Sequence, residues 1–382
     1  MGTLVRVRSD RCARRFLLAG LAGLAVLATT VPASAQTLTW SVVPSPNRPG
    51  GNYLYGISCA SATACMAVGN STASSTAVPK TLAESWNGTH WVIVPSPNWG
   101  TSLSGLGGVS CLSATACTAV GASSSGTLIE SWNGTRWSVV PSPNPNASGV
   151  GLEGVSCVSA TACTAVGSYS TSKGSDTLIE SWNGTRWSVV PSPNPGDENT
   201  LVGVSCVSAT ACVAVGNTNT STGAHSEALA ESWDGTSWSA VVIPGIKSSF
   251  GGVSCVSATV CVAVGDVNDR GNTSSTLVES WDGTSWSQVP SSGGERYSYL
   301  HDVSCASATA CTAVGYERDN NREATLVESW DGTSWSMVHS PGTGDTLSGV
   351  SCTSASACIA AGTRYTSTSV AKTLIESGTV GA

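Results

Sequence analysis

Residues 154–195 read GVSCVSATACTAVGSYSTSKGSDTLIESWNGTRWSVVPSPNP, and the chain repeats this stretch with variations along its length. Each copy contains two cysteines separated by five residues, and the first cysteines of successive copies lie 46–52 residues apart. A fixed period of this length is the signature of a repeat architecture. The seven pairs are Cys59/Cys65, Cys111/Cys117, Cys157/Cys163, Cys206/Cys212, Cys255/Cys261, Cys305/Cys311 and Cys352/Cys358.

The first 35 residues have the pattern of a signal peptide. Five arginines precede an apolar run over residues 16–31, and Ala33-Ser34-Ala35 supplies the small residues of a cleavage site. The alternative is a membrane anchor, but the run is shorter than the ~20 residues that a spanning helix needs. We therefore expect residues 1–35 to be removed near Ala35. The mature chain is then secreted or extracellular, with no membrane span.

The expected mature chain is acidic and rich in paired cysteines. The leader holds five of the 17 basic and one of the 24 acidic residues, which leaves 12 basic and 23 acidic. A negative field of this size repels nucleic acid. Zinc is the alternative role for cysteines, but a five-residue spacing and only four histidines do not fit a zinc site. In an exported chain, the seven pairs predict seven disulfides.

One repeat predicts four antiparallel strands. The residues around Cys157 and Cys163 form two short strands joined by a Ser-Ala-Thr tip. A direct disulfide would cross this hairpin, and it should staple a turn rather than hold distant parts together. A variable polar segment follows, and then two further strands flank Asn183-Gly184, a strong hairpin signal.

The register of the second hairpin follows from the length of its loop. With a two-residue loop, Trp182 would oppose Thr185 and Glu180 would oppose Trp187. Alternation then places Glu180, Trp182, Trp187 and Val189 on one face of the sheet.

A glutamate recurs in the third strand of every copy, as Glu84, Glu130, Glu180, Glu231, Glu279, Glu328 and Glu376. A carboxylate can act in catalysis, but an enzyme needs one asymmetric site. We therefore interpret the seven recurring glutamates as structural. No basic residue recurs with them, so their partners should be indole N–H groups, hydroxyls or backbone amides. The repeated tryptophans are interpreted as wedges between sheets, with stacking on sugars as the alternative.

The two ends of the chain complement each other. The seventh copy stops after its third strand, whereas residues 38–45 read as a fourth strand that lacks the first three. A closed ring explains both ends, because the N-terminal strand completes the last sheet. The predicted fold is all-β: a seven-bladed β-propeller of four-stranded antiparallel blades over residues 36–382, with residues 349–377 and 38–45 sharing the last blade.

The run Ile179-Glu180-Ser181-Trp182, followed by Trp187 and Pro191, resembles the third and fourth strands of kelch-type propeller blades. Residues 232–238, SWDGTSW, also resemble a shortened Asp-box of sialidase-like propellers. The chain departs from both patterns: the kelch Gly-Gly pair is a single glycine, and the Asp-box spacing is one residue too short. The repeats are also similar to those of secreted bacterial proteins with no defined activity. These resemblances imply a propeller and identify no reaction.

The variable loops are the place to look for function, because binding residues are commonly carried on loops of a rigid scaffold. In a radial meander, the loops between strands two and three emerge on one face, together with the connections between blades. Charged and aromatic residues concentrate there in copy six, and copies five and seven add Asp266 and Tyr365. The candidate binding residues are Glu295, Arg296, Tyr297, Tyr299, His301, Asp302, Tyr316, Glu317, Arg318 and Asp319.

We expect a non-catalytic monomer that binds a carbohydrate or a protein through this face. The alternative is a carbohydrate-active hydrolase or lyase, because Glu295, Asp302, Glu317 and Asp319 could approach one another. A purely structural envelope component is a third possibility. No G-x-S-x-G, Walker or H-E-x-x-H pattern appears in the sequence. A calcium loop at residues 266–271 is weakened by Arg270 at a ligand position, and no cofactor or metal is expected.

Overall fold

The computed structural model describes residues 38–380 apart from residues 75, 101, 146, 220–225, 244–246, 270–272, 294–296, 320–321 and 368. The side chains of residues 269, 319 and 322 are not described either. The predicted signal peptide lies outside the described residues. In the described part the regular structure consists of strands, and none of its elements is a helix that could cross a membrane.

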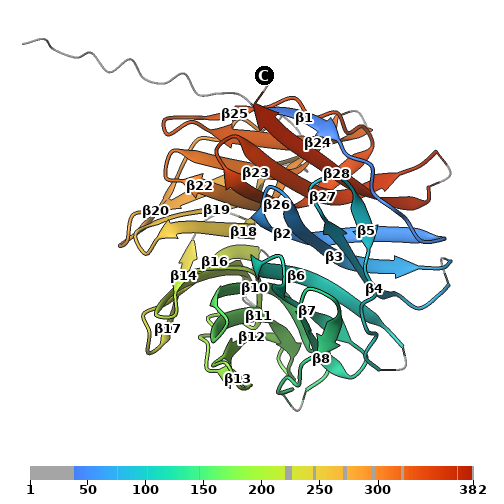
Figure 1. The fold of residues 1–382 in the computed structure, drawn as a ribbon. Helices are drawn as coiled ribbons and strands as arrows, with labels where there is room; N and C mark the ends of the chain where they lie inside the picture. The colour runs from blue at the N-terminus through green and yellow to red at the C-terminus, as the bar shows by residue number, and fades with distance from the viewer. Residues whose placement is uncertain are drawn as a thin grey trace, which may run out of the picture. The chain divides into compact units, whose positions relative to one another are not determined.

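Six repeats supply four strands each and the seventh supplies three, and the repeats follow one another in chain order (Figure 1). The first strands are β2 (Gly51–Ser61), β6 (Ser104–Ser113), β10 (Gly151–Ser159), β14 (Glu198–Ser208), β18 (Lys247–Ser257), β22 (Ser298–Ser307) and β26 (Asp345–Ser354). The second strands are β3 (Ala64–Thr72), β7 (Ala116–Ser123), β11 (Ala162–Ser170), β15 (Ala211–Asn219), β19 (Val260–Asp269), β23 (Ala310–Asp319) and β27 (Ala357–Tyr365). The third strands are β4 (Lys80–Trp86), β8 (Gly126–Trp132), β12 (Ser175–Trp182), β16 (Ser226–Trp233), β20 (Thr273–Trp281), β24 (Arg322–Trp330) and β28 (Ala371–Val380). The fourth strands are β5 (Trp91–Ile93), β9 (Trp137–Val139), β13 (Trp187–Val190), β17 (Trp238–Ile243), β21 (Trp286–Gln288), β25 (Trp335–Met337) and β1 (Leu38–Val42).

The strands form five four-stranded sheets and one eight-stranded sheet, rather than seven separate sheets as expected. The eight-stranded sheet consists of the meanders β10–β13 and β14–β17, which meet at one parallel pair, Ser175 with Glu198. The reason is local. The Ser175 hydroxyl donates to the carbonyl of Asn199, and the Asn199 amide donates to the carbonyl of Ser175, so the starts of β12 and β14 are held together.

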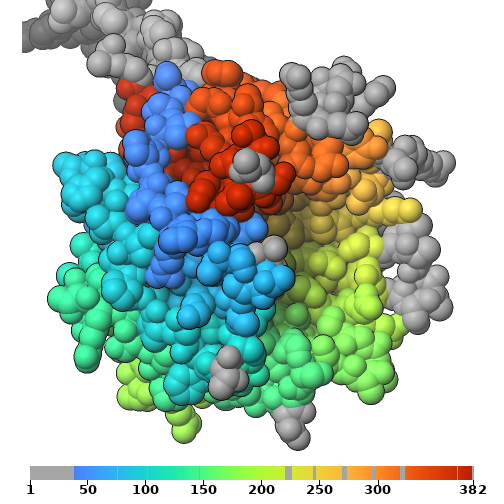
Figure 2. Space-filling view, turned by 90° about the vertical axis from the view of Figure 1, so that its right-hand side faces the viewer, coloured from blue at the N-terminus to red at the C-terminus, as the bar shows by residue number. Residues whose placement is uncertain are grey.

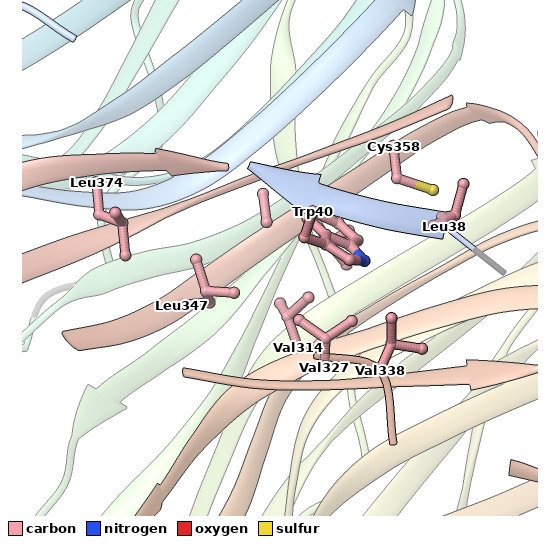
Figure 3. Packing of buried hydrophobic residues seen from close by; sticks show 10 residues of the cluster. Leu38, Trp40, Val314, Val327, Val338, Leu347, Cys358 and Leu374 are labelled. Atoms are coloured by element: carbon pink, nitrogen blue, oxygen red, sulfur yellow. The ribbon is translucent and has the colours of Figure 1, made fainter. Parts of the chain in front are cut away.

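The N-terminal strand completes the last sheet, as the sequence predicts. β1 pairs antiparallel with β28, with Trp40 opposite Gly378 and Val42 opposite Glu376. The blue strand and the red C-terminal strand lie side by side in Figure 1. Trp40 also packs on Val314 and Val327 of the preceding sheet (Figure 3). The two ends of the described chain are therefore joined by hydrogen bonds and by a shared apolar core.

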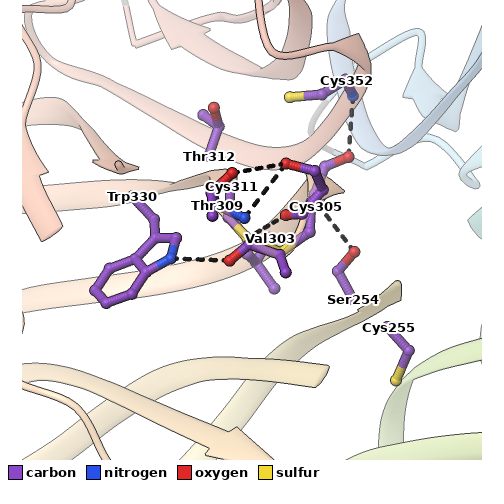
Figure 4. The surroundings of a disulfide bond; sticks show 12 residues. Ser254, Cys255, Val303, Cys305, Thr309, Cys311, Thr312, Trp330 and Cys352 are labelled. Carbon is purple, nitrogen blue, oxygen red and sulfur yellow. Dashed lines mark hydrogen bonds between the residues drawn. A yellow bond between two sulfur atoms is a disulfide. The ribbon is translucent and has the colours of Figure 1, made fainter. Parts of the chain in front are cut away.

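A circle of hydrogen bonds joins the first strands of the seven repeats, which we call the inner strands. The backbone N–H of the first cysteine in each repeat donates to a serine hydroxyl on the first strand of the preceding repeat, at 2.9–3.0 Å. Figure 4 shows two of these bonds, at Cys305 and Cys352. The seven pairs are Cys59–Ser351, Cys111–Ser58, Cys157–Ser110, Cys206–Ser156, Cys255–Ser205, Cys305–Ser254 and Cys352–Ser304. Every repeat supplies one donor and one acceptor through its Ser-Cys sequence, so the circle closes.

Glycine precedes the Val-Ser-Cys motif where neighbouring inner strands approach closely. A Cβ at Gly108 would lie 2.7 Å from the carbonyl oxygen of Glu153 and 3.1 Å from the Cα of Gly154. The equivalent glycines have a similarly crowded contact with the next inner strand. Asp302 occupies this position in β22 and is the exception.

The disulfide prediction is confirmed in all seven repeats. Each bridge connects directly opposed cysteines of the first two strands, for example Cys157 and Cys163 in β10 and β11. The adjacent tip is tied to the third strand, because the indole N–H of Trp182 donates to the Ala160 carbonyl at 3.1 Å. Figure 4 shows the same bond from Trp330. These contacts make the disulfide-bearing face nearly identical from repeat to repeat.

The second cysteine of each pair is a core residue, which corrects the expectation that the bridge only staples a turn. It lies on the face of its sheet that packs against the preceding repeat: Cys163 shares an apolar cluster with Val120 and Ile129 of the second repeat. Figure 3 shows Cys358 in the equivalent cluster of the last sheet. Each bridge therefore also contributes to the contact between repeats. The buried second cysteines, each 2–6% exposed, are Cys65, Cys117, Cys163, Cys212, Cys261, Cys311 and Cys358.

The predicted register of the second hairpin is wrong by two residues. Trp182 opposes Trp187, and Glu180 opposes Val189, so the loop has four residues. Asn183 causes the longer loop: its side-chain oxygen accepts hydrogen bonds from the backbone and hydroxyl of Thr185 and from the backbone of Arg186. A shift of two preserves alternation, so the predicted set of residues still shares one face. The Trp182 and Trp187 rings lie 5.7 Å apart.

The recurring glutamate is structural, and its partner is a hydroxyl. Glu180 is fully buried and accepts a hydrogen bond of 2.7 Å from Ser142 of the preceding repeat. Five other copies repeat this bond, as Ser45–Glu84, Ser96–Glu130, Ser192–Glu231, Ser291–Glu328 and Ser340–Glu376. Glu279 differs, because Ile243 stands where the other repeats have the serine. Burial raises the pKa of Glu84, Glu180 and Glu231 to about 7 and that of Glu130 to about 8.

We predict that Gly108→Ala lowers the free energy of unfolding by about 1–3 kcal/mol, because the added methyl collides with the next inner strand. Chemical denaturation measures the loss. Gly105→Ala in the same strand is the matched control: its Cβ would meet only Asn70, at 3.6 Å, and should change stability by less than about 0.5 kcal/mol. Equal effects of the two substitutions would contradict the close approach of the strands.

We also predict that the midpoint of thermal unfolding is higher at pH 5 than at pH 8. The folded chain keeps protons on the buried glutamates above their unfolded pKa of 4.5, so stability is greatest below that value and falls as the pH rises through about 7 to 8. Burial lowers the pKa of His301, which gives the opposite slope below pH 6.5, but this is one group against several. Glu130→Gln should flatten the profile, and Glu198→Gln on the surface should leave it unchanged.

Candidate functional site

A central cavity of about 460 Å³ is lined by all seven first strands. Each of these strands has a register shift that leaves one extra residue outside the ladder, such as Glu153 between Leu152 and Gly154. A β-bulge changes the direction in which the side chain of the extra residue points, and in this chain the extra residues line the cavity. They are Tyr55, Gly107, Glu153, Val202, Gly251, His301 and Ser348. The cavity wall therefore differs in chemistry from repeat to repeat, although the backbone is the same.

Two of the predicted binding residues, His301 and Asp302, line this cavity. The Nδ1 atom of His301 lies 2.9 Å from the Leu347 carbonyl, and burial lowers the pKa of the ring. A neutral ring donates its Nδ1 proton to that carbonyl, which leaves Nε2 as an acceptor.

Asp302 is engaged with the backbone on both of its oxygens. One oxygen accepts from Val303 at 2.8 Å, and the other accepts from Val350 of the next repeat at 2.9 Å. Burial raises its pKa to about 7, which these two bonds oppose. This carboxyl group is thus a bridge between two inner strands. The equivalent position is glycine in the other repeats.

The aromatic residues of copy six come together at the start of β22 and the end of β23. The rings of Tyr299 and Tyr316 stack with centroids 4.9 Å apart, and the His301 ring lies 5.5 Å from that of Tyr316. Beside them Arg318 forms a salt bridge with Glu323. Tyr297 has a left-handed backbone (φ 52°), and its carbonyl accepts a hydrogen bond from the Arg318 backbone.

The remaining predicted residues are only partly described. Glu317 is half-buried and pairs through its backbone with Ser298. Glu295 and Arg296 lie outside the described residues, as does the side chain of Asp319. Within the described part of the chain, no group of three or more His, Cys, Asp or Glu side chains could hold a metal ion.

The disulfide cysteines lie apart from this site. No cysteine lines the central cavity, and the inner strands reach it through their bulged residues instead. The buried second cysteines are packed between sheets, so they support the scaffold. This holds for Cys65, Cys212, Cys261, Cys311 and Cys358 in their respective apolar clusters.

Tyrosines are concentrated in the first, sixth and seventh repeats. Of the seven in the chain, only Tyr169 lies elsewhere. Tyr53 and Tyr55 stack with centroids 6.5 Å apart, and Tyr55 accepts a hydrogen bond from Asn70. Burial, with the nearby Tyr53, raises the pKa of Tyr365, a residue that is 47% exposed. We call Tyr53, Tyr55, Tyr299, Tyr316 and Tyr365 the tyrosine group. The group combines two of the predicted copy-six residues with tyrosines of the first and seventh repeats, which received less weight in the sequence analysis.

A groove of about 680 Å³ lies between the loops of the second and third repeats. Its wall includes Ser124, Asn144 and Ser148, and it shares Glu153 with the central cavity. Figure 2 shows the surface that carries the loops between the second and third strands; the colours follow chain order around it, and blue lies against red. Glu153 was missed in the sequence analysis, although the residue directly before the recurring Gly-Val-Ser-Cys differs from repeat to repeat.

We predict that Asp302→Ala lowers the free energy of unfolding by about 1–3 kcal/mol, because the N–H groups of Val303 and Val350 lose their acceptor. Urea denaturation measures the change. Glu317→Ala in the adjacent strand removes a carboxylate of the same repeat and should change stability by less than about 0.5 kcal/mol. A neutral Asp302→Ala would show that this carboxyl does not link the inner strands.

No protein-family model and no curated protein matches this sequence. Solved structures do match. YCF48 bound to a D1 peptide is 12% identical with a TM-score of 0.53, covering 92% of this chain and 97% of its own. An ulvan lyase of polysaccharide lyase family PL25, bound to a GlcA–Rha3S saccharide, is 10% identical with a TM-score of 0.56, covering 87% and 95%. U3-55K is 11% identical with a TM-score of 0.56, covering 90% and 99%. These structures are β-propellers, and the chain shares their fold.

Proposed function

We propose that this chain is an exported, non-catalytic, seven-bladed β-propeller that binds a protein or a carbohydrate at its loop-bearing face. The observation that carries the proposal is that one residue, Glu153, lines both the central cavity and an open groove. The first-strand contacts run in a cycle through all seven repeats, which supports seven blades, the eight-stranded sheet being two of them. The seven disulfides suit an oxidising compartment and so support export. The kelch-like or Asp-box character of the blades stays a prediction.

The tyrosine group suits either class of ligand. Aromatic rings supply large contact area at low entropic cost and stack on sugars or pack on peptide segments. Among the structures of similar fold, one is described with a peptide and another with a saccharide, which is consistent with this range. The proposed site keeps the ten copy-six residues: Tyr299, His301 and Tyr316, whose rings lie together, and also Glu295, Arg296, Tyr297, Asp302, Glu317, Arg318 and Asp319.

Two observations favour binding over hydrolysis or elimination. A general acid or base needs a carboxyl that is free to exchange a proton with the substrate. Asp302 instead accepts two backbone hydrogen bonds, and Glu323 is paired with Arg318. Among the copy-six carboxylates, the hydrolase or lyase alternative then depends on Glu295, Glu317 and Asp319, and the test below substitutes the first two.

The test is a screen of the purified mature chain on a glycan array and a peptide array, followed by titration of the best ligand. We expect Tyr299→Ala and Tyr365→Ala each to weaken that ligand by about tenfold, since hot-spot aromatics contribute more than ~1 kcal/mol. Tyr169→Ala is the matched control and should bind like the wild type. Turnover of any array saccharide that is abolished by Glu295→Gln or Glu317→Gln would overturn the non-catalytic proposal.

A further inference from the structure

Glu153 is the charged residue at which the cavity and the groove meet. It is the extra residue of the β10 bulge, so its side chain leaves the sheet and projects into the cavity. Within the part of the chain that the structure describes, no side-chain hydrogen bond or salt bridge is formed by this carboxylate. The side chain is exposed to solvent within the hollow, and the protein walls around it raise its pKa, with no hydrogen-bond donor to oppose the shift. This sets Glu153 apart from Asp302, whose two oxygens both have donors.

The surroundings of Glu153 contain no compensating positive charge. None of the residues that line either hollow is a lysine or an arginine. The one histidine among them, His301, is held neutral by burial and donates to a carbonyl. A carboxylate that lines a hollow, faces solvent and has no ion partner is available to a cation, and the surrounding protein walls reduce the screening of that attraction by water.

The space beside Glu153 is narrow. Its flanking inner strands carry glycine, and a Cβ added at Gly107 would already lie 3.1 Å from a carboxylate oxygen of Glu153. The unbranched stem of lysine or arginine fits beside these backbones. The exposed rings of Tyr55 and Tyr365 would contact the rest of such a segment, and aromatic faces attract cations.

We infer that the ligand is a protein segment that places a lysine or arginine side chain in the central cavity against the Glu153 carboxylate. This inference rests on the proposed function, and it names the class of ligand and the residue that selects it. The backbone of the segment lies in the groove between the second and third repeats, and its basic side chain turns inward at Glu153.

The experiment uses the intact mature chain with two probes: pentalysine amide and the pentamer of glucosamine, an amino sugar with the same kind of charge. Calorimetric titration at low salt measures both dissociation constants. We expect pentalysine to bind, and Glu153→Gln to weaken it at least about tenfold, as loss of a shielded charge partner does. Glu198→Gln is the matched control. It removes one carboxylate near the start of β14 that lines neither hollow, so it should change the affinity by less than about twofold.

Each other outcome is decisive. Equal weakening by Glu153→Gln and Glu198→Gln would show attraction to net charge only and would overturn the inference. Binding of the glucosamine pentamer without pentalysine would replace the protein ligand by an amino sugar, and absence of pentalysine binding would overturn it as well. If the array ligand is lost on Tyr299→Ala but unaffected by Glu153→Gln, the inference fails while the proposed function stands. Circular dichroism of each variant confirms that it is folded.

Discussion

The inner edge of each first strand is the constraint on which the rest of this structure depends. Apart from the single bridge between β14 and β12, a first strand pairs on one side only, so its other side turns a row of backbone N–H and C=O groups toward the axis. Leaving such groups without partners is costly. In this chain the Ser-Cys sequence supplies a partner: the serine hydroxyl of one repeat accepts a hydrogen bond from the cysteine N–H of the next, at 2.9–3.0 Å. Because the bond runs from repeat to repeat, it is satisfied at every repeat only when the last repeat meets the first.

This constraint also decides where variation is possible. Serine and cysteine are fixed by the hydrogen bond and the disulfide, and glycine before them is fixed by the close approach of the next strand, as at Gly108. The bulged residue is free, because it belongs to neither ladder and points into the cavity. That freedom yields tyrosine at position 55, glutamate at 153 and histidine at 301 on equivalent backbones. The chemistry of the cavity can therefore change without cost to the scaffold, which is the property a binding protein requires.

The sequence pattern was sufficient for the cysteine pairs, the four-strand repeat and the joining of the ends, because each follows from spacing and alternation alone. It was insufficient for the hairpin at Asn183, where a side-chain oxygen with three donors lengthens the loop to four residues. Nor did spacing show that the second cysteine, such as Cys163, is buried against the neighbouring repeat, because that contact depends on how two sheets pack.

The sequence pattern also missed Glu153. A bulge shows only when the strand is aligned with its partner, and without that alignment the residue counts as part of the ladder. Copy six was selected because it contains many charged residues. The number of charges does not distinguish Asp302, which accepts two backbone hydrogen bonds, from Glu153, a carboxylate without a hydrogen-bond donor.

The buried glutamates add a second layer of links between neighbouring repeats, farther from the axis. All of them except Glu279 accept a hydrogen bond from a serine of the preceding repeat, and burial favours the protonated form, as at Glu180. The contact between the fourth and fifth repeats lacks this link, since Ile243 replaces the serine and packs against the apolar core that contains Phe250. Burial raises the pKa of Glu279 with no hydroxyl to offset it. Apolar packing thus replaces a hydrogen bond at this one interface, while the Ser205–Cys255 bond still joins the same two repeats nearer the axis. The inner circle is therefore the link that no described repeat omits, and the outer one tolerates exchange.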